Sequence, residues 1–257
     1  MVDEYFKKGN VIDLDLGCEI YKYIPFKYLK LMIQNSSLFF GRVDKWEDVY
    51  ENWFLKERII LSSGQEGVAN NLIPGVYGQS WTLLEESDAM WRIYSKLDRN
   101  SANYLDETAV KIKTTAQKLF DVIYTEDKDM ASSYIGKVKY LSQDDFRKMQ
   151  DSLSPMSPMD LNEVFVKSYF FKRTPFEHEK EVRPIIIFPP SDAKFGQNGI
   201  SYSIDYDCLI EEMVCDPRLT PEEYRSIRAQ LLNLGVKSNI VTHSDLYQLQ
   251  QHVIYMK

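Results

Sequence analysis

The chain has 257 residues, a formal net charge of −7 at pH 7, and contents of 44% hydrophobic and 13% aromatic residues. The acidic balance excludes a protein that holds nucleic acid by charge alone, because such proteins need a basic face to displace counterions. No run of eighteen apolar residues occurs, and the first seventeen residues lack an apolar signal core. We therefore expect no membrane span and no secretion signal, and predict a cytoplasmic protein.

The cysteine and histidine residues form no spacing typical of a disulfide framework or a zinc site. We expect the thiols to be buried and unpaired, and we expect no metal cofactor. These residues are Cys18, Cys208, Cys215, His178, His243 and His252.

The first third of the chain predicts a strand, a helix and a second strand. Residues 20–24 are aromatic and β-branched, residues 26–34 place apolar side chains at helical spacing, and residues 38–40 are apolar and end at a glycine. We predict a helix within residues 47–60 and a loop over residues 62–78, where Gly, Ser and Asn are frequent.

In the middle of the chain, segments with the periodicity of a strand alternate with segments that have the periodicity of a helix. We predict strands over residues 76–82, 109–114 and 133–141, helices over residues 89–96, 115–124 and 142–153, a loop at 154–158, and a helix or strand within 160–172.

The last third predicts a mostly β region that ends in a strand, a helix and a strand. Residues 180–189 form the most β-prone stretch, and Pro184 within them predicts an edge strand or a bulge. Strands are expected at 199–204, 209–215 and 236–242, with a helix over 220–234 that begins with Thr-Pro-Glu-Glu. We expect the strands on either side of this helix to be parallel. The sequence thus predicts one domain, residues 1–257, of α+β class, with mainly antiparallel central sheets and flanking helices.

The strongest candidate for chemistry is the segment from Glu179 to Arg183. Strand alternation would put Glu179, Glu181 and Arg183 on one face, where Arg183 could hold Glu181 ionised. A fixed carboxylate can accept a hydrogen bond from a sugar hydroxyl or stabilise an oxocarbenium ion. The alternative is an ordinary solvated edge strand that carries an Arg–Glu pair.

Three further segments carry candidate ligand contacts. Ser80 lies on an aromatic strand and could orient a carboxylate on a neighbouring strand. Lys22 lies between two tyrosines, where a cation could bind phosphate and a ring could stack on a base. The helix that contains Trp91 and Tyr94 is expected to turn one face to the core and the other to a cleft.

These segments together resemble the bacterial domain of unknown function 2971 family. The resemblance lies in an opening Tyr-Lys-Tyr strand, a Trp46-Glu47-Asp48 loop, an aromatic strand with a serine, a Met-Trp-x-x-Tyr helix and a late Glu-x-Glu-x-Arg strand.

The order of motifs is also similar, more distantly, to the ADP-ribosyltransferase fold. That resemblance implies NAD as the substrate, with Lys22 or Tyr23 at the early NAD-binding position and Ser80 at the supporting position. It implies that Glu181 is catalytic and that Glu179 engages the acceptor. The residues expected to bind NAD are Tyr21, Lys22, Tyr23, Trp81, Trp91, Tyr94 and Arg183.

The resemblance implies an NAD-dependent ADP-ribosyltransferase, a bacterial toxin or phage-defence effector that modifies a protein or a nucleic acid, with a neutralising antitoxin as a partner. One alternative is a non-catalytic module that binds a nucleotide or a partner. The other is a nuclease in which carboxylates hold Mg²⁺. Its candidate ligands are Asp44, Asp48, Glu51, Glu179 and Glu181.

Overall fold

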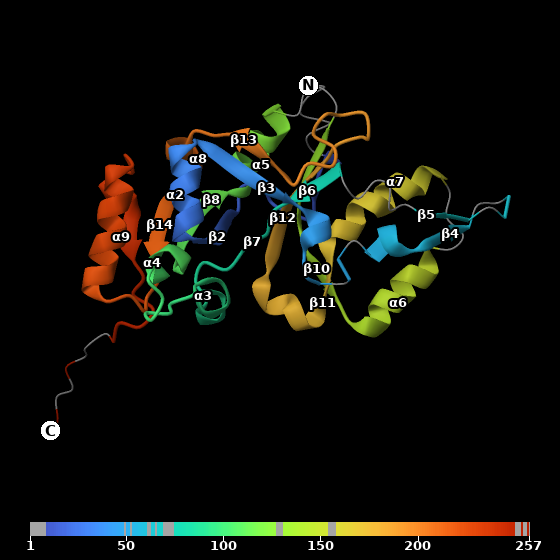
Figure 1. Ribbon diagram of the computed structural model, residues 1–257. Coiled ribbons are helices and arrows are strands. Elements are labelled where there is room, and N and C mark those ends of the chain that lie inside the picture. Colours follow the sequence, from blue (N-terminus) through green and yellow to red (C-terminus); the bar gives the residue numbers. More distant parts are fainter. Residues whose placement is uncertain are drawn as a thin grey trace.

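A large mixed sheet forms the centre of the molecule in the computed structural model (Figure 1). The structure describes residues 9–48, 50–51, 53–60, 63–64, 66–68, 75–126, 131–153, 158–249, 253 and 256. Its strands run in the order β13-β3-β6-β12-β7-β2-β8-β14-β15, with β9 beside β12 and β1 beside β9. They are β1 (Val11–Ile12), β2 (Glu19–Pro25), β3 (Ser37–Arg42), β6 (Val76–Gly78), β7 (Trp81–Thr82), β8 (Ala109–Thr115), β9 (Ser132–Lys137), β12 (Glu181–Ile187), β13 (Gly199–Ser203), β14 (Glu212–Cys215) and β15 (Val241–His243).

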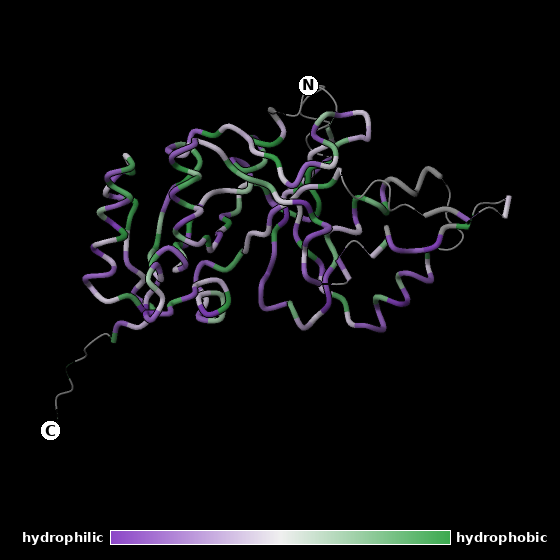
Figure 2. The backbone as a smooth tube through the Cα atoms, viewed as in Figure 1, coloured by the Kyte–Doolittle hydropathy of each residue, from purple (hydrophilic) through white to green (hydrophobic). Residues whose placement is uncertain are grey.

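Helices and two small sheets flank this sheet. In Figure 1, α2, α4 and α9 lie toward one end of it, while α6, α7 and the pair β4–β5 form a lobe at the other end. Figure 2 shows hydrophilic residues along the outer helices, most clearly on α6. The elements are α2 (Phe26–Gln34), α3 (Asp88–Tyr94), α4 (Tyr104–Glu107), α5 (Ala116–Glu126), α6 (Gln143–Ser152), α7 (Pro158–Lys167), α8 (Tyr206–Leu209), α9 (Pro221–Asn233), β4 (Arg58–Ile60), β5 (Glu66–Val68), β10 (Lys139–Leu141) and β11 (Phe171–Arg173).

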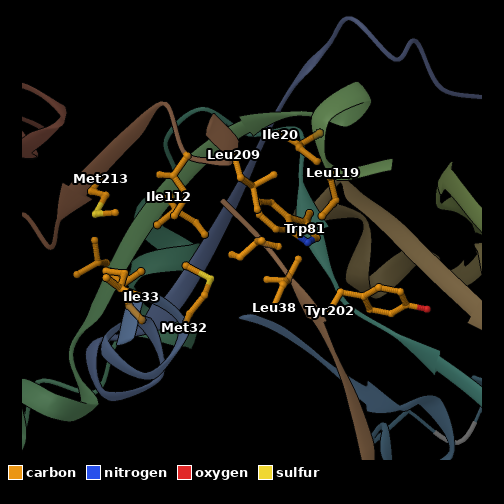
Figure 3. Packing of buried hydrophobic residues seen from close by; sticks show 14 of the residues in the cluster. Ile20, Met32, Ile33, Leu38, Trp81, Ile112, Leu119, Tyr202, Leu209 and Met213 are labelled. Carbon is orange, nitrogen blue, oxygen red and sulfur yellow. The ribbon is translucent and has the colours of Figure 1, made fainter. Parts of the chain in front are cut away.

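The two faces of the sheet are packed by different hydrophobic clusters. The main cluster includes Met32 from α2, Leu119 from α5 and Trp81 from β7, which belong to one packed group of side chains in Figure 3. A second cluster, which includes Phe146 and Ile185, joins the lobe to the opposite face of β12. Strand β12 is therefore covered on both faces, and its seven residues are buried or nearly so.

The sheet forks at Gln79 and Ser80. Strands β6 and β7 are two halves of one strand, and both pair with β12, but the residues between them leave the ladder. On the other edge β6 pairs with β3, whereas β7 pairs with β2. Strands β3 and β2 thus separate at this point, and a gap lined by side chains opens between them.

Side chains at the fork pair with two backbone carbonyls and with one buried indole N–H. Gln79 Nε2 donates to the carbonyl oxygen of Phe39 at 2.5 Å, and Gln79 Oε1 accepts from Trp81 Nε1 at 2.8 Å. Lys22 Nζ donates to the carbonyl oxygen of Ser80 at 2.8 Å. Because a buried carbonyl without a partner is costly, these bonds stabilise the fork.

The predicted α+β class with a mainly antiparallel sheet is confirmed. The C-terminal strand, helix and strand are confirmed as β14, α9 and β15, with β14 and β15 parallel, but the last strand is Val241–His243 and a 3₁₀ turn, Ser238–Ile240, replaces much of the strand predicted over 236–242. Thr220 caps α9 through a capping box with Glu223, as the Thr-Pro-Glu-Glu signal predicts.

Two predicted elements are wrong in detail. The helix expected within residues 47–60 is replaced by a short 3₁₀ turn, Trp53–Lys56, and by β4, because residues 58–60 pair with β5 in a hairpin; residues 49 and 52 lie outside the described part. The strand expected over 133–141 breaks at Val138, whose N–H donates to the carbonyl oxygen of Glu181, and continues as β10, which pairs with β11.

The prediction that Pro184 marks an edge strand is also wrong. Pro184 lies in the middle of β12, between β9 and the β6–β7 strand. It lies opposite Gln79, so the N–H that proline lacks falls at the interruption between β6 and β7, where the regular ladder is already broken. Its carbonyl oxygen accepts from the Gln79 N–H at 3.2 Å.

Three remaining expectations concern surfaces and loops. No helix of the described residues is long and apolar enough to cross a membrane. Cys208 is exposed, which corrects the expectation of buried thiols, while Cys215 is buried; both are unpaired. Residues 69–74 and 154–157, in the two predicted loops, and His252 lie outside the described part.

Replacing Gln79 by Ala should destabilise the fork. The change removes the partners of the Phe39 carbonyl and of the Trp81 N–H, and each buried group left without a partner costs about 1–3 kcal/mol. We expect the free energy of unfolding, measured by urea titration, to fall by about 2–4 kcal/mol. The exposed Gln248→Ala is the matched control, with an expected change within about 0.5 kcal/mol; equal stability of the two variants would show that the fork does not depend on Gln79.

Candidate active site

Glu181 begins β12 at the fork and is 3% exposed. Its Oε1 accepts a hydrogen bond from Ser80 Oγ at 2.8 Å, across the interruption between β6 and β7. Its Oε2 accepts from Arg183 Nε at 2.6 Å, because residues two apart share a face of the strand. The structure therefore brings Ser80, Glu181 and Arg183 together, in the relation expected from the sequence.

Lys172, on β11, completes the surroundings of the carboxylate. Its Nζ lies 3.2 Å from Glu181 Oε1 and 2.6 Å from Glu179 Oε2. The ammonium group also lies over the ring of Phe176, 4.5 Å from the ring centroid. The sequence did not reveal Lys172 as a member of this cluster, because no local pattern predicts that β11 pairs with β10 beside the start of β12.

Glu179 lies near Glu181, but not because the two residues share one face of a strand, as the sequence predicted. It ends a 3₁₀ turn, Thr174–Glu179, and Lys180 adopts a left-handed conformation at φ 44°, so strand alternation does not extend back to Glu179. The shared ammonium group of Lys172 brings the two carboxylates together instead. The Glu179 carbonyl oxygen also accepts from Thr82 Oγ1 at 2.6 Å.

A third carboxylate joins the cluster from the loop before the lobe. Glu51 pairs with Arg183 Nη2, while Arg183 Nη1 donates to the Tyr169 carbonyl oxygen at 2.7 Å. The cluster of Glu51, Glu179, Glu181, Lys172 and Arg183 thus holds three acids and two bases, all at most 7% exposed. With every group ionised, its formal charge is −1.

The surroundings push the pKa values of the two neighbouring carboxyls apart. Burial alone would raise the pKa of Glu181, but the charges of Arg183 and Lys172 outweigh it and lower that pKa to about 2. Burial raises the pKa of Glu179 above its ordinary value despite the bond from Lys172. Glu181 is therefore the member of the pair that stays ionised, and Glu179 is the member that more readily holds a proton.

Two cavities meet at this cluster. One, of about 780 Å³, is lined by all five residues of the cluster together with Asp48, Arg173 and Phe176. The other, of about 680 Å³, fills the fork between β2 and β3. Trp46, Ser80 and Tyr94 line both, so the two spaces adjoin beside Glu181.

The residues predicted to bind NAD are divided between these spaces and the core. Tyr21, Lys22, Tyr23, Trp81 and Tyr94 line the fork cavity, although Trp81 is only 2% exposed. Arg183 lines the other cavity.

Trp91 lines neither cavity, which departs from its expected place in a cleft. It is fully buried behind Tyr23, edge-on at a centroid distance of 4.7 Å, and its Nε1 donates to Glu86 at 2.8 Å.

Trp46, and not Trp91, is the tryptophan that lines both cavities. Its ring lies 4.6 Å from the Arg183 guanidinium, and a Cβ added to Gly78 would stand 3.1 Å from it. The sequence shows Trp46 in a loop rich in acids and aromatic residues, but nothing in that pattern fixes which ring faces the site.

Comparison with known proteins gives a distant likeness. No model of a known protein family matches the chain, and no curated protein matches it in sequence, so the resemblance to the domain of unknown function 2971 family stays a prediction. Solved structures of DarT from Thermus sp. 2.9 align over 90% of this chain and 96% of theirs. The complex with NAD+ aligns at 11% identity and a TM-score of 0.38, and the complex with ADP-ribosylated ssDNA at 10% and 0.37. A likeness at these TM-scores carries no functional inference.

Replacing Lys172 by Met should destabilise the protein in a pH-dependent way. The change leaves Arg183 as the one cation of a cluster with three buried carboxylates. Removing one partner of a buried ion pair costs about 3–5 kcal/mol. Because the pKa of Glu181 is lowered to about 2 by its cations, this stabilisation is present above the ordinary pKa of 4.5 and is lost as pH falls through 2. The loss on substitution, measured by urea titration, should therefore be largest near pH 7 and shrink in acid.

The matched control is Lys167→Met, which breaks an exposed pair with Glu163 on α7. Such pairs contribute less than about 1 kcal/mol. If the two variants lose the same stability at pH 7, Lys172 does not hold the cluster together.

Proposed function

We propose that the protein is an NAD-dependent ADP-ribosyltransferase with Glu181 as its catalytic carboxylate. The observation that carries the proposal is a buried glutamate, held ionised by two cations and by Ser80, at the point where two large cavities adjoin. Burying such a group is costly unless it is paired, and with every group ionised this cluster carries a formal charge of −1 beside open space. Charge of that sign stabilises a positively charged reacting group.

Cleavage of NAD develops positive charge, which the negative charge of this cluster would stabilise. When the bond between the nicotinamide nitrogen and C1′ of the ribose breaks, its electron pair leaves with nicotinamide, which becomes neutral, and positive charge develops on the ribose. A carboxylate fixed as Glu181 is fixed would stabilise this oxocarbenium ion and accept a hydrogen bond from the 2′-hydroxyl. Because Arg183 and Ser80 already orient the carboxylate, little reorganisation is needed in the transition state.

Glu179 is the residue proposed to act on the acceptor. An acceptor atom that attacks C1′ loses a proton, and the carboxylate form of Glu179 could take it. Its raised pKa, caused by burial, brings it closer to the working pH of a general base than Glu181. The 780 Å³ cavity beside it offers the room for an acceptor group.

The biological setting of the proposal comes from the resemblance in sequence. It comprises a toxin or phage-defence effector in the cytoplasm, a neutralising antitoxin, and a protein side chain or a nucleic acid as the acceptor. The Mg²⁺-dependent nuclease is not favoured, because Lys172 and Arg183 already pair with Glu51, Glu179 and Glu181. In the described part of the chain, no three His, Cys, Asp or Glu side chains are placed so that they could hold one metal ion.

Replacing Glu181 by Gln should abolish most of the release of nicotinamide from NAD. Loss of a fixed transition-state contact costs about 10²–10³ in rate. Nicotinamide is quantified by liquid chromatography, and circular dichroism with thermal unfolding checks that the variant is folded. The control is Glu177→Gln, an exposed glutamate paired with Lys180 and outside both cavities, which should keep full activity.

Wild-type rates in the folded Glu181→Gln variant would remove Glu181 from the mechanism. Stabilisation of the wild-type protein by NAD without any release of nicotinamide or labelling of a macromolecule would instead favour the non-catalytic binding module.

NAD binding should weaken as pH rises through about 8. Burial lowers the pKa of Lys22 to about 8, so its charge is present below that pH and is lost above it. If Lys22 meets the diphosphate, the Kd measured by calorimetry rises over this range. Lys22→Arg should bind at all these pH values, and Lys22→Met should bind weakly at all of them; a wild-type Kd that does not change between pH 7 and 9 would contradict this role.

A further inference from the structure

The fork cavity carries positive charge, although it adjoins a cluster with more acids than bases. Among the described residues that line it, Lys22 is the one charged side chain, and no acid faces it. The adjoining cavity holds the five-residue cluster, with its net charge of −1. The two spaces are therefore complementary to a ligand that is anionic along one part and cationic at the end near Glu181.

The outer part of the fork cavity is apolar and exposed. Tyr28 and Leu31 on α2 are 52% and 51% exposed, and Phe39 on β3 is 59% exposed, yet all three line the cavity. Large apolar side chains that gather at the mouth of a cavity mark a surface that is covered in use.

Glycines shape the floor of this mouth. Gly41, Gly78 and Gly199 occupy paired positions on β3, β6 and β13, so a strip of the sheet carries no side chain. A Cβ added to Gly199 would collide with the Phe39 ring, so this ring occupies the space above Gly199, while Phe39 remains 59% exposed. A Cβ added to Gly41 would meet nothing nearer than the same ring at 3.9 Å, so space for a planar group remains there.

We propose that this mouth is the adenine subsite, with the adenine ring packed against the exposed Phe39 ring in the space above Gly41. The dinucleotide then lies along the fork cavity, with its diphosphate near Lys22 and its nicotinamide end at Ser80 and Glu181. This orientation rests on the proposed use of NAD. It assigns the exposed aromatic residues to the adenylate half and leaves the 780 Å³ cavity to the acceptor.

The test separates the two halves of the ligand by using Phe39→Ala, Gly41→Val and the control Leu249→Ala. Gly41→Val fills the free space without backbone strain, since Gly41 does not have a positive φ. Leu249 is 90% exposed and lines neither cavity. The substrates are NAD and nicotinamide mononucleotide, which lacks the adenylate, and AMP is titrated separately by calorimetry.

For Phe39→Ala and Gly41→Val we expect kcat/KM for NAD to fall about tenfold, the loss typical of one base–aromatic stack. The value for nicotinamide mononucleotide should stay within about twofold of wild type, since that substrate has no group at the mouth. The Kd for AMP should rise about tenfold in both variants and stay unchanged in Leu249→Ala.

The inference is overturned if AMP does not bind the wild-type protein, if it binds the two variants as tightly as wild type, or if both substrates lose activity equally. A wild-type protein that binds AMP through Phe39 but releases no nicotinamide would retain the adenine subsite and refute the transferase chemistry instead.

Discussion

The buried pairing of Glu181 with Arg183 and Lys172 is the interaction on which the site depends. Taking charges out of water costs several kcal/mol per ion, and replacing such a cluster by apolar residues is often stabilising. A cluster kept at this cost at the edge of two cavities is better explained by chemistry than by stability. It also explains why β12 is central: the strand must be fixed on both faces to hold Glu181 in one orientation.

The fork supplies the space that this carboxylate needs. A continuous strand at Gln79 and Ser80 would close the sheet between β3 and β2, and the fork cavity would not exist. The interruption instead turns Ser80 toward Glu181 and leaves its carbonyl to Lys22. One break in one strand thus creates the cavity, orients the carboxylate and places a cation on the cavity wall.

Much of the fold follows from local sequence patterns, whereas the site follows from them in part. The helix at Phe26–Gln34 and the capped helix after Thr220 have strong periodicity and end signals, so they were predictable. The pairing of Arg183 with Glu181 follows from strand alternation. Lys172 was not predictable as a partner of Glu181, nor Glu51 as a partner of Arg183, because their approach depends on long-range packing of β11 and of the loop that holds Glu51. The interruption at Gln79 also has no local signal, since residues 76–82 alternate as one strand.

The most direct test is a crystal structure of the protein with a non-cleavable carbocyclic analogue of NAD. The proposed mechanism predicts the nicotinamide-bearing ring beside Ser80, with its 2′-hydroxyl within hydrogen-bond distance of a Glu181 oxygen. It also predicts that Arg183 and Lys172 still contact that carboxylate. A dinucleotide bound away from Glu181, or a Glu181 side chain turned from the ligand toward its cations alone, would contradict the mechanism.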